Sequence, residues 1–464
     1  MTLIKSISGI RGTIGGKPTE NLTPLDAVKF ASAYGIWLQR RNPNKNKLKV
    51  VVGRDARISG KMMASLVSNT LVGLGIDVVN ASLSTTPTVE IAVTLENADG
   101  GIIITASHNP KQWNALKLLN ENGEFLNDTE GKLILEIAEK EDFNFAFVDD
   151  LGSFEKKRDF IEKHIDLVLN LDLVNIEAIK KAKFKIVVDG VNSSGGIAIP
   201  ALLERLGVDV VKLFCEPNGE FPHNPEPLKE HLSDISELVV REKAHLGIVV
   251  DPDVDRLAII NEDGSMFGEE YTLVACADYV LSKTPGNTVS NLSSSRALKD
   301  ITEKYGQKYT AAAVGEVNVV AAMKNTNAII GGEGNGGIIY PQSHYGRDSL
   351  VGVALFLSHL AESGNSCKQL RNTFPNYFMS KNKIELKTGF NVDNLLIKIK
   401  EIYANELLNE IDGLKIDFDS EWVHLRKSNT EPIIRIYTES NSQEKADALA
   451  LKLLNEIKSI AANM

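Results

Sequence analysis

The sequence predicts an α/β protein made of three similar α/β domains followed by a smaller α+β module. Strand-forming and helix-forming segments alternate along most of the chain, which is typical of parallel strands covered by helices. Similar segments recur, with LGIDVV at residues 74–79 and LGVDVV at residues 206–211. The stretch of chain between these two segments is longer than the period of a solenoid repeat. The last hundred residues contain strand-like runs that favour antiparallel hairpins.

The first domain is expected over residues 1–145. Its β–α–β order is carried by residues 47–57, 59–75 and 76–85. A further strand, Ile102–Ile104, ends at the polar sequence TASHNP, in which Ser107 precedes His108. This pair fits either a hydrolytic nucleophile or a strand that ends in a turn. The G-x-S-x-G elbow of serine hydrolases is missing, and neighbouring side chains on an extended loop are expected to point apart.

The second domain is expected over residues 155–258. The strand Ile248–Val250 leads into DPDVDR, which supplies Asp251, Asp253 and Asp255 within one short loop. Three converging carboxylates repel one another unless a cation neutralises them, and an all-oxygen ligand set suits Mg²⁺. The spacing lacks the glycine and glutamate of a calcium-binding EF-hand. The sequence therefore predicts a magnesium site, with a solvated acidic turn as the alternative.

The third domain is expected over residues 259–368 and contains the glycine-rich stretch IGGEGNGGIIY at residues 330–340. The letters G-x-G-x-x-G match a dinucleotide-binding fingerprint, but that fingerprint opens a helix, and here a strand and a turn are predicted to follow. Glycines let the backbone approach a ligand closely, and a carboxylate accepts hydrogen bonds from hydroxyl groups. We expect Glu333 and Asn335 to bind a sugar.

The C-terminal module is expected over residues 375–464, with helical spacing at 391–411 and in the final segment. The stretch LRKSNTEPIIR at residues 425–435 gathers cationic and hydroxyl side chains around one turn. Guanidinium groups, hydroxyls and exposed backbone N–H groups are typical of a phosphate-binding loop, and an ordinary polar hairpin is the alternative. The candidate phosphate-binding residues are Arg426, Ser428, Asn429, Thr430 and Arg435.

The composition limits the classes of partner. The chain of 464 residues has a net charge of −10, which argues against nucleic acid or a membrane surface as the main partner. A local cationic loop still permits a phosphorylated small molecule. Three cysteines without a CxxC pair and no secretion signal favour the cytoplasm. No apolar segment reaches the roughly 18 residues that a membrane span requires.

A metal site and a phosphate-binding loop in one cleft would change the interpretation of Ser107. Phosphoryl transfer depends mainly on positioning and charge stabilisation. A phosphoserine carries nearly two negative charges and provides a Mg²⁺ ligand. Ser107 is then predicted to be a phosphate carrier, phosphorylated at rest, that donates to a sugar hydroxyl. Lys117 would assist proton transfer or stabilise developing charge, although a lone lysine on a loop is commonly a solvated surface residue.

The four loops together resemble those of the α-D-phosphohexomutase family, which includes phosphoglucomutases, phosphomannomutases and phosphoglucosamine mutases. TASHNP resembles the phosphoserine loop, DPDVDR the Mg²⁺ loop, GEGNG the sugar-recognition loop and RKSNTEP the phosphate-binding loop. They occur in the family's order, one per domain, and SGIRG at residues 8–12 resembles the family's N-terminal motif. The catalytic candidates are Ser107, Arg11, Lys117, His108 and Arg256, and the candidate metal ligands are Ser107, Asp251, Asp253 and Asp255.

The resemblance implies three α/β/α domains with mixed sheets and a C-terminal domain of the TATA-binding-protein-like type, arranged around a central cleft. It implies reversible conversion of a hexose 6-phosphate into a hexose 1-phosphate. Phosphoserine at residue 107 gives its phosphoryl group to the substrate, and the sugar 1,6-bisphosphate so formed reorients before Ser107 takes back the other group. One Mg²⁺ per chain and a phosphosugar are the expected cofactor and partner, in a monomer or homodimer.

Two positions differ from many phosphomannomutases, which have serine and histidine where this chain has Asn335 and Gly337. A role for that histidine cannot be transferred, so the general base stays unassigned. The loop is closer to that of some phosphoglucosamine mutases, which favours glucosamine phosphate as the substrate. The alternatives are a phosphoglucomutase or phosphomannomutase, a phosphosugar-binding protein without catalysis, and a serine hydrolase or phosphatase.

Overall fold

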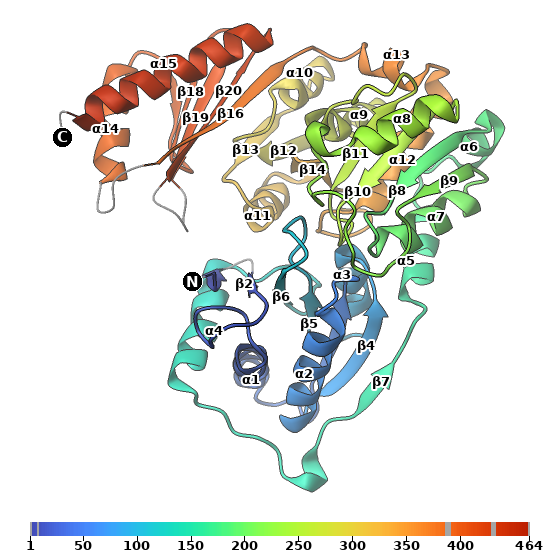
Figure 1. Cartoon of the computed structure of the whole chain (residues 1–464), viewed down its shortest axis with the longest axis vertical. Coiled ribbons are helices and arrows are strands. Elements are labelled where there is room, and N and C mark those ends of the chain that lie inside the picture. Colours follow the sequence, from blue (N-terminus) through green and yellow to red (C-terminus); the bar gives the residue numbers. More distant parts are fainter. Residues whose placement is uncertain (1, 7–8, 386–390, 428–432, 463–464) are drawn as a thin grey trace.

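The computed structural model of the chain describes residues 2–6, 9–385, 391–427 and 433–462. It confirms three α/β/α domains with mixed sheets and a C-terminal module with one antiparallel sheet. In Figure 1 the first domain (blue) lies at the bottom, the second and third (green to orange) lie together at the upper right, and the C-terminal module (red) lies at the upper left.

The first domain has a seven-stranded sheet in the order β1-β2-β6-β5-β3-β4-β7. Alternate residues of the β-branched strand β3 face opposite sides: Val50 and Val52 pack in one core and Val51 in the other. A strand buried on both faces must be apolar along its whole length. The elements are β1 (Ile4–Ser6), β2 (Gly9–Thr13), α1 (Pro24–Arg41), β3 (Lys49–Arg54), α2 (Gly60–Gly73), β4 (Asp77–Leu83), α3 (Thr86–Leu95), β5 (Gly100–Ile104), β6 (Trp113–Leu119), α4 (Asp128–Lys140) and β7 (Phe154–Lys156).

The second and third domains each have a four-stranded sheet, in the orders β11-β10-β8-β9 and β13-β12-β14-β15. The second contains α5 (Phe160–Leu169), α6 (Ile176–Ala182), β8 (Lys185–Asp189), α7 (Gly195–Arg205), β9 (Asp209–Leu213), α8 (Ser233–Arg241), β10 (Leu246–Val250) and β11 (Leu257–Asn261). The third contains α9 (Glu269–Lys283), β12 (Asn287–Asn291), α10 (Ala297–Lys304), β13 (Tyr309–Ala312), α11 (Glu316–Thr326), β14 (Ala328–Glu333), β15 (Gly337–Ile339), α12 (Ser349–Ser363) and α13 (Cys367–Arg371).

The same four-stranded unit recurs in all three domains. Its orders are β4-β3-β5-β6, β9-β8-β10-β11 and β13-β12-β14-β15, and in each the last strand alone is antiparallel. The loop before that antiparallel strand carries TASHNP in the first domain, DPDVDR in the second and GEGNG in the third. The three sequence motifs therefore occupy the same topological position. The sequence predicted one motif in each domain but not that their positions are equivalent.

Two predicted boundaries fall inside sheets. The boundary between residues 258 and 259 lies within β11, whose hydrogen bonds to β10 keep it in the second sheet. The predicted start of the second domain at residue 155 lies within β7, which pairs with β4 in parallel and so extends the first sheet. The third domain was expected to end at residue 368, and α13 crosses that position.

The C-terminal module is a five-stranded antiparallel sheet in the order β16-β20-β19-β18-β17, with two helices packed against it. Its elements are β16 (Phe378–Glu385), α14 (Val392–Ile402), β17 (Leu407–Asn409), β18 (Leu414–Asp417), β19 (Trp422–Lys427), β20 (Ile433–Ser440) and α15 (Gln443–Ala462). The helix predicted over residues 391–411 ends at Ile402, because residues 407–409 pair with β18 as an edge strand.

The cores show which domains form one body. A single apolar core runs through the second and third domains, where α12 packs against α5, α6 and α7. The C-terminal module has an apolar core of its own. Among the residues that the structure describes, no helix has the length and apolar character that crossing a bilayer requires.

Candidate active site

A cleft of about 1460 Å³ lies between the four domains and is lined by many of the predicted site residues. Its walls include Ser107 and Lys117 from the first domain, Arg256 from the second, Glu333 from the third and Arg426 from the C-terminal module. Arg11, His108, Asn335 and Arg435 line it as well. The structure thus brings together side chains that lie more than 400 residues apart in the sequence.

Ser107 lies directly after β5, in a left-handed backbone conformation with φ of 50°. This conformation is uncommon for a non-glycine residue and is typical of functional sites under local strain. The Ser107 side chain is buried, and its Oγ donates a hydrogen bond of 2.7 Å to Asp251 Oδ2. The serine of the first domain therefore contacts the aspartate loop of the second domain directly.

His108 does not point away from Ser107, as the sequence analysis expected. Its Nδ1 lies 3.3 Å from Ser107 Oγ, because the left-handed turn at Ser107 brings successive side chains to the same side. Burial, together with the positive charges of Arg256 and Arg11, lowers the pKa of His108 well below its usual range. The imidazole is neutral at neutral pH and faces the serine.

A buried arginine that the sequence analysis missed holds the Ser107 loop in place. The guanidinium of Arg57 donates to the backbone carbonyls of Ser107 and Asn109, each at 2.5 Å, and to those of Pro110 and Trp113. Its Nε pairs with Asp55 at 3.0 Å. The sequence signal that could have revealed Arg57 was GRDAR, which follows β3. Because β3 and β5 are parallel neighbours, their carboxyl ends meet at one edge of the sheet, which places Arg57 beside the Ser107 loop.

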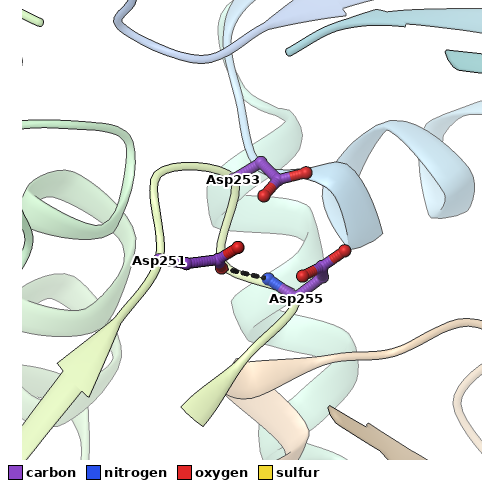
Figure 2. A group of neighbouring side chains, drawn as sticks. All are labelled: Asp251, Asp253 and Asp255. Atoms are coloured by element: carbon purple, nitrogen blue, oxygen red, sulfur yellow. Dashed lines mark hydrogen bonds between the residues drawn. The ribbon is translucent and has the colours of Figure 1, made fainter. Parts of the chain in front are cut away.

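The three aspartates converge as predicted (Figure 2). Asp251, Asp253 and Asp255 follow β10, are fully buried, and each offers one carboxylate oxygen within 4.8 Å of the others. The backbone N–H of Asp255 donates to Asp251 Oδ1 at 3.1 Å, which tightens the loop. Burial, reinforced by Asp255 and Asp253, raises the pKa of Asp251 well above its usual range. A negative charge on Asp251 is therefore unfavourable unless a further cation binds to the cluster.

The donor set of this cluster fits a magnesium ion. Asp253 Oδ1 and Asp255 Oδ1 are buried and have no hydrogen-bond partner. Unpaired buried carboxylate oxygens are costly, and a cation bound between them would remove that cost. Together with Asp251 Oδ2 and Ser107 Oγ they form an all-oxygen set, which is the chemistry that Mg²⁺ prefers.

Lys117 is a buried strand residue and not the solvated loop residue that its sequence context suggested. It lies on β6, and its Nζ donates to Asp253 Oδ2 at 2.7 Å and approaches Asp255 Oδ2 at 3.4 Å. Burial alone would lower the pKa of Lys117, but Asp253 and Asp255 outweigh it and the pKa is raised. Lys117 is therefore a fixed cation, suited to stabilising charge and poorly suited to accepting a proton.

Arg11 and Arg256 supply further positive charge near Ser107. Arg11 lies on β2 and donates to the Asn109 side chain at 3.0 Å, within the serine loop. Arg256 follows the aspartate loop and donates to Glu226 at 3.1 Å, while its Nε has no partner although it is buried. Both guanidinium groups line the cleft, where an anion on Ser107 would meet them.

The candidate sugar-binding carboxylate of the third domain is held in place by hydrogen bonds within the protein. Glu333, at the end of β14, accepts hydrogen bonds from Asn291 Nδ2 at 2.9 Å and from the backbone N–H of Gly315 at 3.1 Å. Burial alone would raise the pKa of Glu333, but Arg347 outweighs it, so the pKa is lowered and the group stays ionised. Asn335 lines the cleft and accepts from the N–H of Gly337.

Two arginines of the C-terminal module face each other across β19 and β20. Arg426 and Arg435 are directly opposite in the antiparallel register, and both line the cleft. Like charges opposite one another destabilise a sheet unless an anion lies between them. Asp412 partly offsets this, since its Oδ2 lies 2.9 Å from Arg426 Nε. The other phosphate-binding candidates, Ser428, Asn429 and Thr430, lie outside the described residues.

Comparison with known proteins identifies the family. Sequence models described as "Phosphoglucomutase/phosphomannomutase" match in chain order: alpha/beta/alpha domain I at residues 3–145, domain II at 162–264, domain III at 268–377 and the C-terminal domain at 385–456. A phosphoglucomutase/phosphomannomutase of Thermococcus kodakarensis is 37% identical over 96% of this chain and 98% of its own. A phosphoglucosamine/phosphogalactosamine mutase of Sulfurisphaera tokodaii is 31% identical over 97% of each chain.

The similarity extends to solved structures. The crystal structure of a phosphoglucomutase/phosphomannomutase family protein from Burkholderia thailandensis superposes with a TM-score of 0.84 at 25% identity, covering 99% of this chain and 98% of the other. The fold and the order of the four domains agree with the resemblance that the sequence motifs indicated. The chain therefore belongs to the α-D-phosphohexomutase family of isomerases.

Proposed function

We propose that this protein interconverts hexose 6-phosphates and hexose 1-phosphates, with Ser107 as the phosphate carrier. The observation that carries the proposal is the position of Ser107 Oγ, 2.7 Å from Asp251 in a buried carboxylate cluster. A hydrolytic serine needs a general base, a part that the neighbouring His108 would also fit, but it does not need a buried cluster of three carboxylates. A phosphorylated serine needs cations and a metal site, and both kinds of group surround this one.

The charges of the site suit a phosphoserine. A phosphoryl group on Ser107 would bring nearly two negative charges beside three aspartates. Arg11, Lys117 and Arg256 line the same cleft and would offset this charge. Mg²⁺ held by Ser107 and the three aspartates would supply further stabilisation of the charge that develops during transfer. Proximity of preorganised cations is the main source of catalysis in phosphoryl transfer.

The proposed reaction has two transfers. In the first, a sugar hydroxyl oxygen bonds to the phosphorus as the bond from phosphorus to Ser107 Oγ breaks, and the proton that the sugar hydroxyl loses ends on Ser107 Oγ. The resulting sugar 1,6-bisphosphate then reorients in the cleft, so that its other phosphate faces Ser107. In the second, Ser107 Oγ bonds to the other phosphorus, the bond from that phosphorus to the sugar oxygen breaks, the serine proton passes to the sugar oxygen, and the hexose monophosphate leaves. Glu333 and Asn335 would hold the sugar hydroxyls in both orientations, and Arg426 and Arg435 would hold the phosphate that is not reacting.

Two kinds of hexose 6-phosphate are candidate substrates: the amino sugar glucosamine 6-phosphate, and the neutral sugars glucose and mannose 6-phosphate. The sugar-recognition loop, with Asn335 and Gly337, favours glucosamine 6-phosphate, as the sequence analysis expected. The 37% identity to a phosphoglucomutase/phosphomannomutase, against 31% to a phosphoglucosamine/phosphogalactosamine mutase, favours glucose or mannose 6-phosphate. Both candidates use the same serine and metal chemistry, so the choice between them leaves the mechanism unchanged.

Steady-state assays with each of the three hexose 6-phosphates test the proposal. We expect turnover with at least one, Mg²⁺ dependence, and loss of turnover in Ser107→Ala. A matched control, Ser65→Ala, removes an exposed hydroxyl on α2 and should leave kcat unchanged. Wild-type turnover in Ser107→Ala would contradict the carrier role. Release of inorganic phosphate faster than isomerisation would favour a phosphatase instead.

A further inference from the structure

Arg347 occupies the wall of the cleft between the aspartate loop and the sugar-recognition loop. It lies in the segment between β15 and α12 and is 8% exposed. Its Nη2 donates to Asp255 Oδ2 at 2.7 Å, and its Nη1 donates to Glu333 Oε2 at 2.9 Å. Its Nε and its backbone N–H donate to the two carboxylate oxygens of Glu316, at 2.9 and 3.1 Å. One guanidinium thus joins three buried carboxylates.

The two ends of this bridge belong to different functional loops. Asp255 is a candidate metal ligand of the second domain, and its other oxygen, Oδ1, is buried and without a partner. Glu333 is the candidate sugar ligand of the third domain, with its other oxygen held by Asn291 and Gly315. A planar guanidinium fixes the direction of both carboxylates at once. If Asp255 rotates toward a metal, the guanidinium of Arg347 has to move with it, and the carboxylate of Glu333 follows.

The glycine at position 337 is a consequence of this bridge. A Cβ atom built on Gly337 would lie 2.3 Å from Arg347 Cδ, which is far too close. The backbone cannot move aside easily, because Ile339 and Arg347 form a β-bridge and the N–H of Asp348 donates to Ile338 at 2.8 Å. A side chain at position 337 and the guanidinium bridge exclude each other. The chain has the bridge where many phosphomannomutases have a histidine.

We propose that Arg347 is a positioning residue that couples metal binding at the three aspartates to sugar binding at Glu333. The inference rests on the proposed function, because it takes both sites to be used. Coupling of this kind is reciprocal: bound sugar phosphate tightens metal binding, and bound metal tightens sugar binding by the same factor. Lysine at position 347 would keep the charge but lack the planar fork, whose three separate nitrogens reach Asp255, Glu333 and Glu316 at once.

The test measures Mn²⁺ binding as a probe of the metal site, by electron paramagnetic resonance of the free ion. Full-length wild type and Arg347→Lys are titrated with Mn²⁺, with and without a saturating hexose 6-phosphate that supports turnover. In wild type we expect the sugar phosphate to tighten Mn²⁺ binding by about fivefold or more. In Arg347→Lys we expect that ratio to fall close to one. A wild-type ratio in Arg347→Lys would overturn the inference.

Two further variants sharpen the experiment. Arg205→Lys makes the same substitution in an exposed ion pair on α7 and should keep the wild-type ratio. Gly337→Ala displaces the Arg347 side chain while leaving every charge in place, and it should lower the ratio even if Arg347→Lys fails to fold. Wild type that binds no Mn²⁺ would refute the proposed function as well. A wild-type ratio that Gly337→Ala and Arg347→Lys both retain would refute the coupling alone.

Discussion

At the residue scale, the site is built by buried charges that hold one another. Arg57 shows this for the serine loop, and Lys117 shows it for the aspartates. Both are almost fully buried, and each is paired with at least one aspartate. A buried charge is tolerated only when it is paired and hydrogen-bonded. The contacts of these two cations hold the Ser107 loop and the aspartate loop in place.

Substitution of Arg57 tests whether the serine loop is held from below. Arg57→Ala leaves Asp55 buried without its cation, and we expect the free energy of unfolding to fall by about 3–5 kcal/mol. Arg57→Lys keeps the charge but loses the fork that reaches the carbonyls of Ser107 and Asn109. We expect it to remain folded while kcat falls. Unfolding by urea and steady-state kinetics measure the two effects, and an unchanged kcat in Arg57→Lys would contradict this role.

At the element scale, one four-stranded unit delivers three different functional loops. In each unit the loop precedes the single antiparallel strand, and the loops that follow β5 and β10 and the end of β14 bring Ser107, Arg256 and Glu333 to the same cleft. Parallel strands place their carboxyl ends at one edge, where ligands bind in such sheets. From the C-terminal module, Arg426 of β19 and Arg435 of β20 line the cleft.

The paired arginines of β19 and β20 give a prediction for substrate binding. We expect Arg435→Ala to raise KM for the hexose phosphate by about tenfold to a hundredfold, because it removes charge-assisted hydrogen bonds to the phosphate. Arg205→Ala, on an exposed surface, serves as the control. Because Arg435 faces Arg426 directly, removing it should also relieve repulsion in the free protein. A KM equal to that of wild type would remove Arg435 from the phosphate site.

The contact between the C-terminal module and the third domain gives a prediction for pH. His424 is buried on β19, with its Nδ1 2.9 Å from Ser293 Oγ and its Nε2 2.6 Å from the carbonyl of Asp412. Burial lowers its pKa to about 4, with the nearby cations Lys415 and Arg426 acting in the same direction and Asp412 opposing them. The folded state thus binds this proton more weakly than the unfolded state does.

Stability of wild type should therefore fall as pH decreases from 6.5 to about 4, by up to about 1.4 kcal/mol per pH unit from this residue. His424→Gln cannot take up the proton, so its stability should fall less over the same range. Urea unfolding of both proteins across these pH values measures the difference. Parallel profiles for the two proteins would show that His424 does not titrate in this way.

At the scale of the whole molecule, the sequence alone predicted the family and the three repeated domains, and it named many of the residues that line one cleft. Ser107, the three aspartates and Glu333 lie in short motifs that follow apolar strands, so local patterns revealed them. Arg57 and Arg347 escaped, because their roles depend on contacts between segments far apart in sequence. The sequence did not show that Lys117 is buried, because its burial depends on the pairing of β6 with β5.

The arrangement of the cores explains how the cleft is held. The second and third domains share one core, so the aspartate and sugar loops are fixed relative to each other, and Arg347 joins them at their meeting point. The first domain is tied to this body where Thr86, at the start of α3, donates to Asp253 at 2.6 Å. The C-terminal module keeps a separate core, and its arginines complete the cleft from the other side.

The central claim is that Ser107 carries the phosphoryl group between the two positions of the sugar. Incubation of the protein with a hexose bisphosphate that bears radiolabelled phosphate, followed by peptide mapping, tests it most directly. The account predicts label on the peptide that contains Ser107, and loss of that label to hexose phosphate when unlabelled substrate is added. Isomerisation at the normal rate with no label on Ser107 would contradict it.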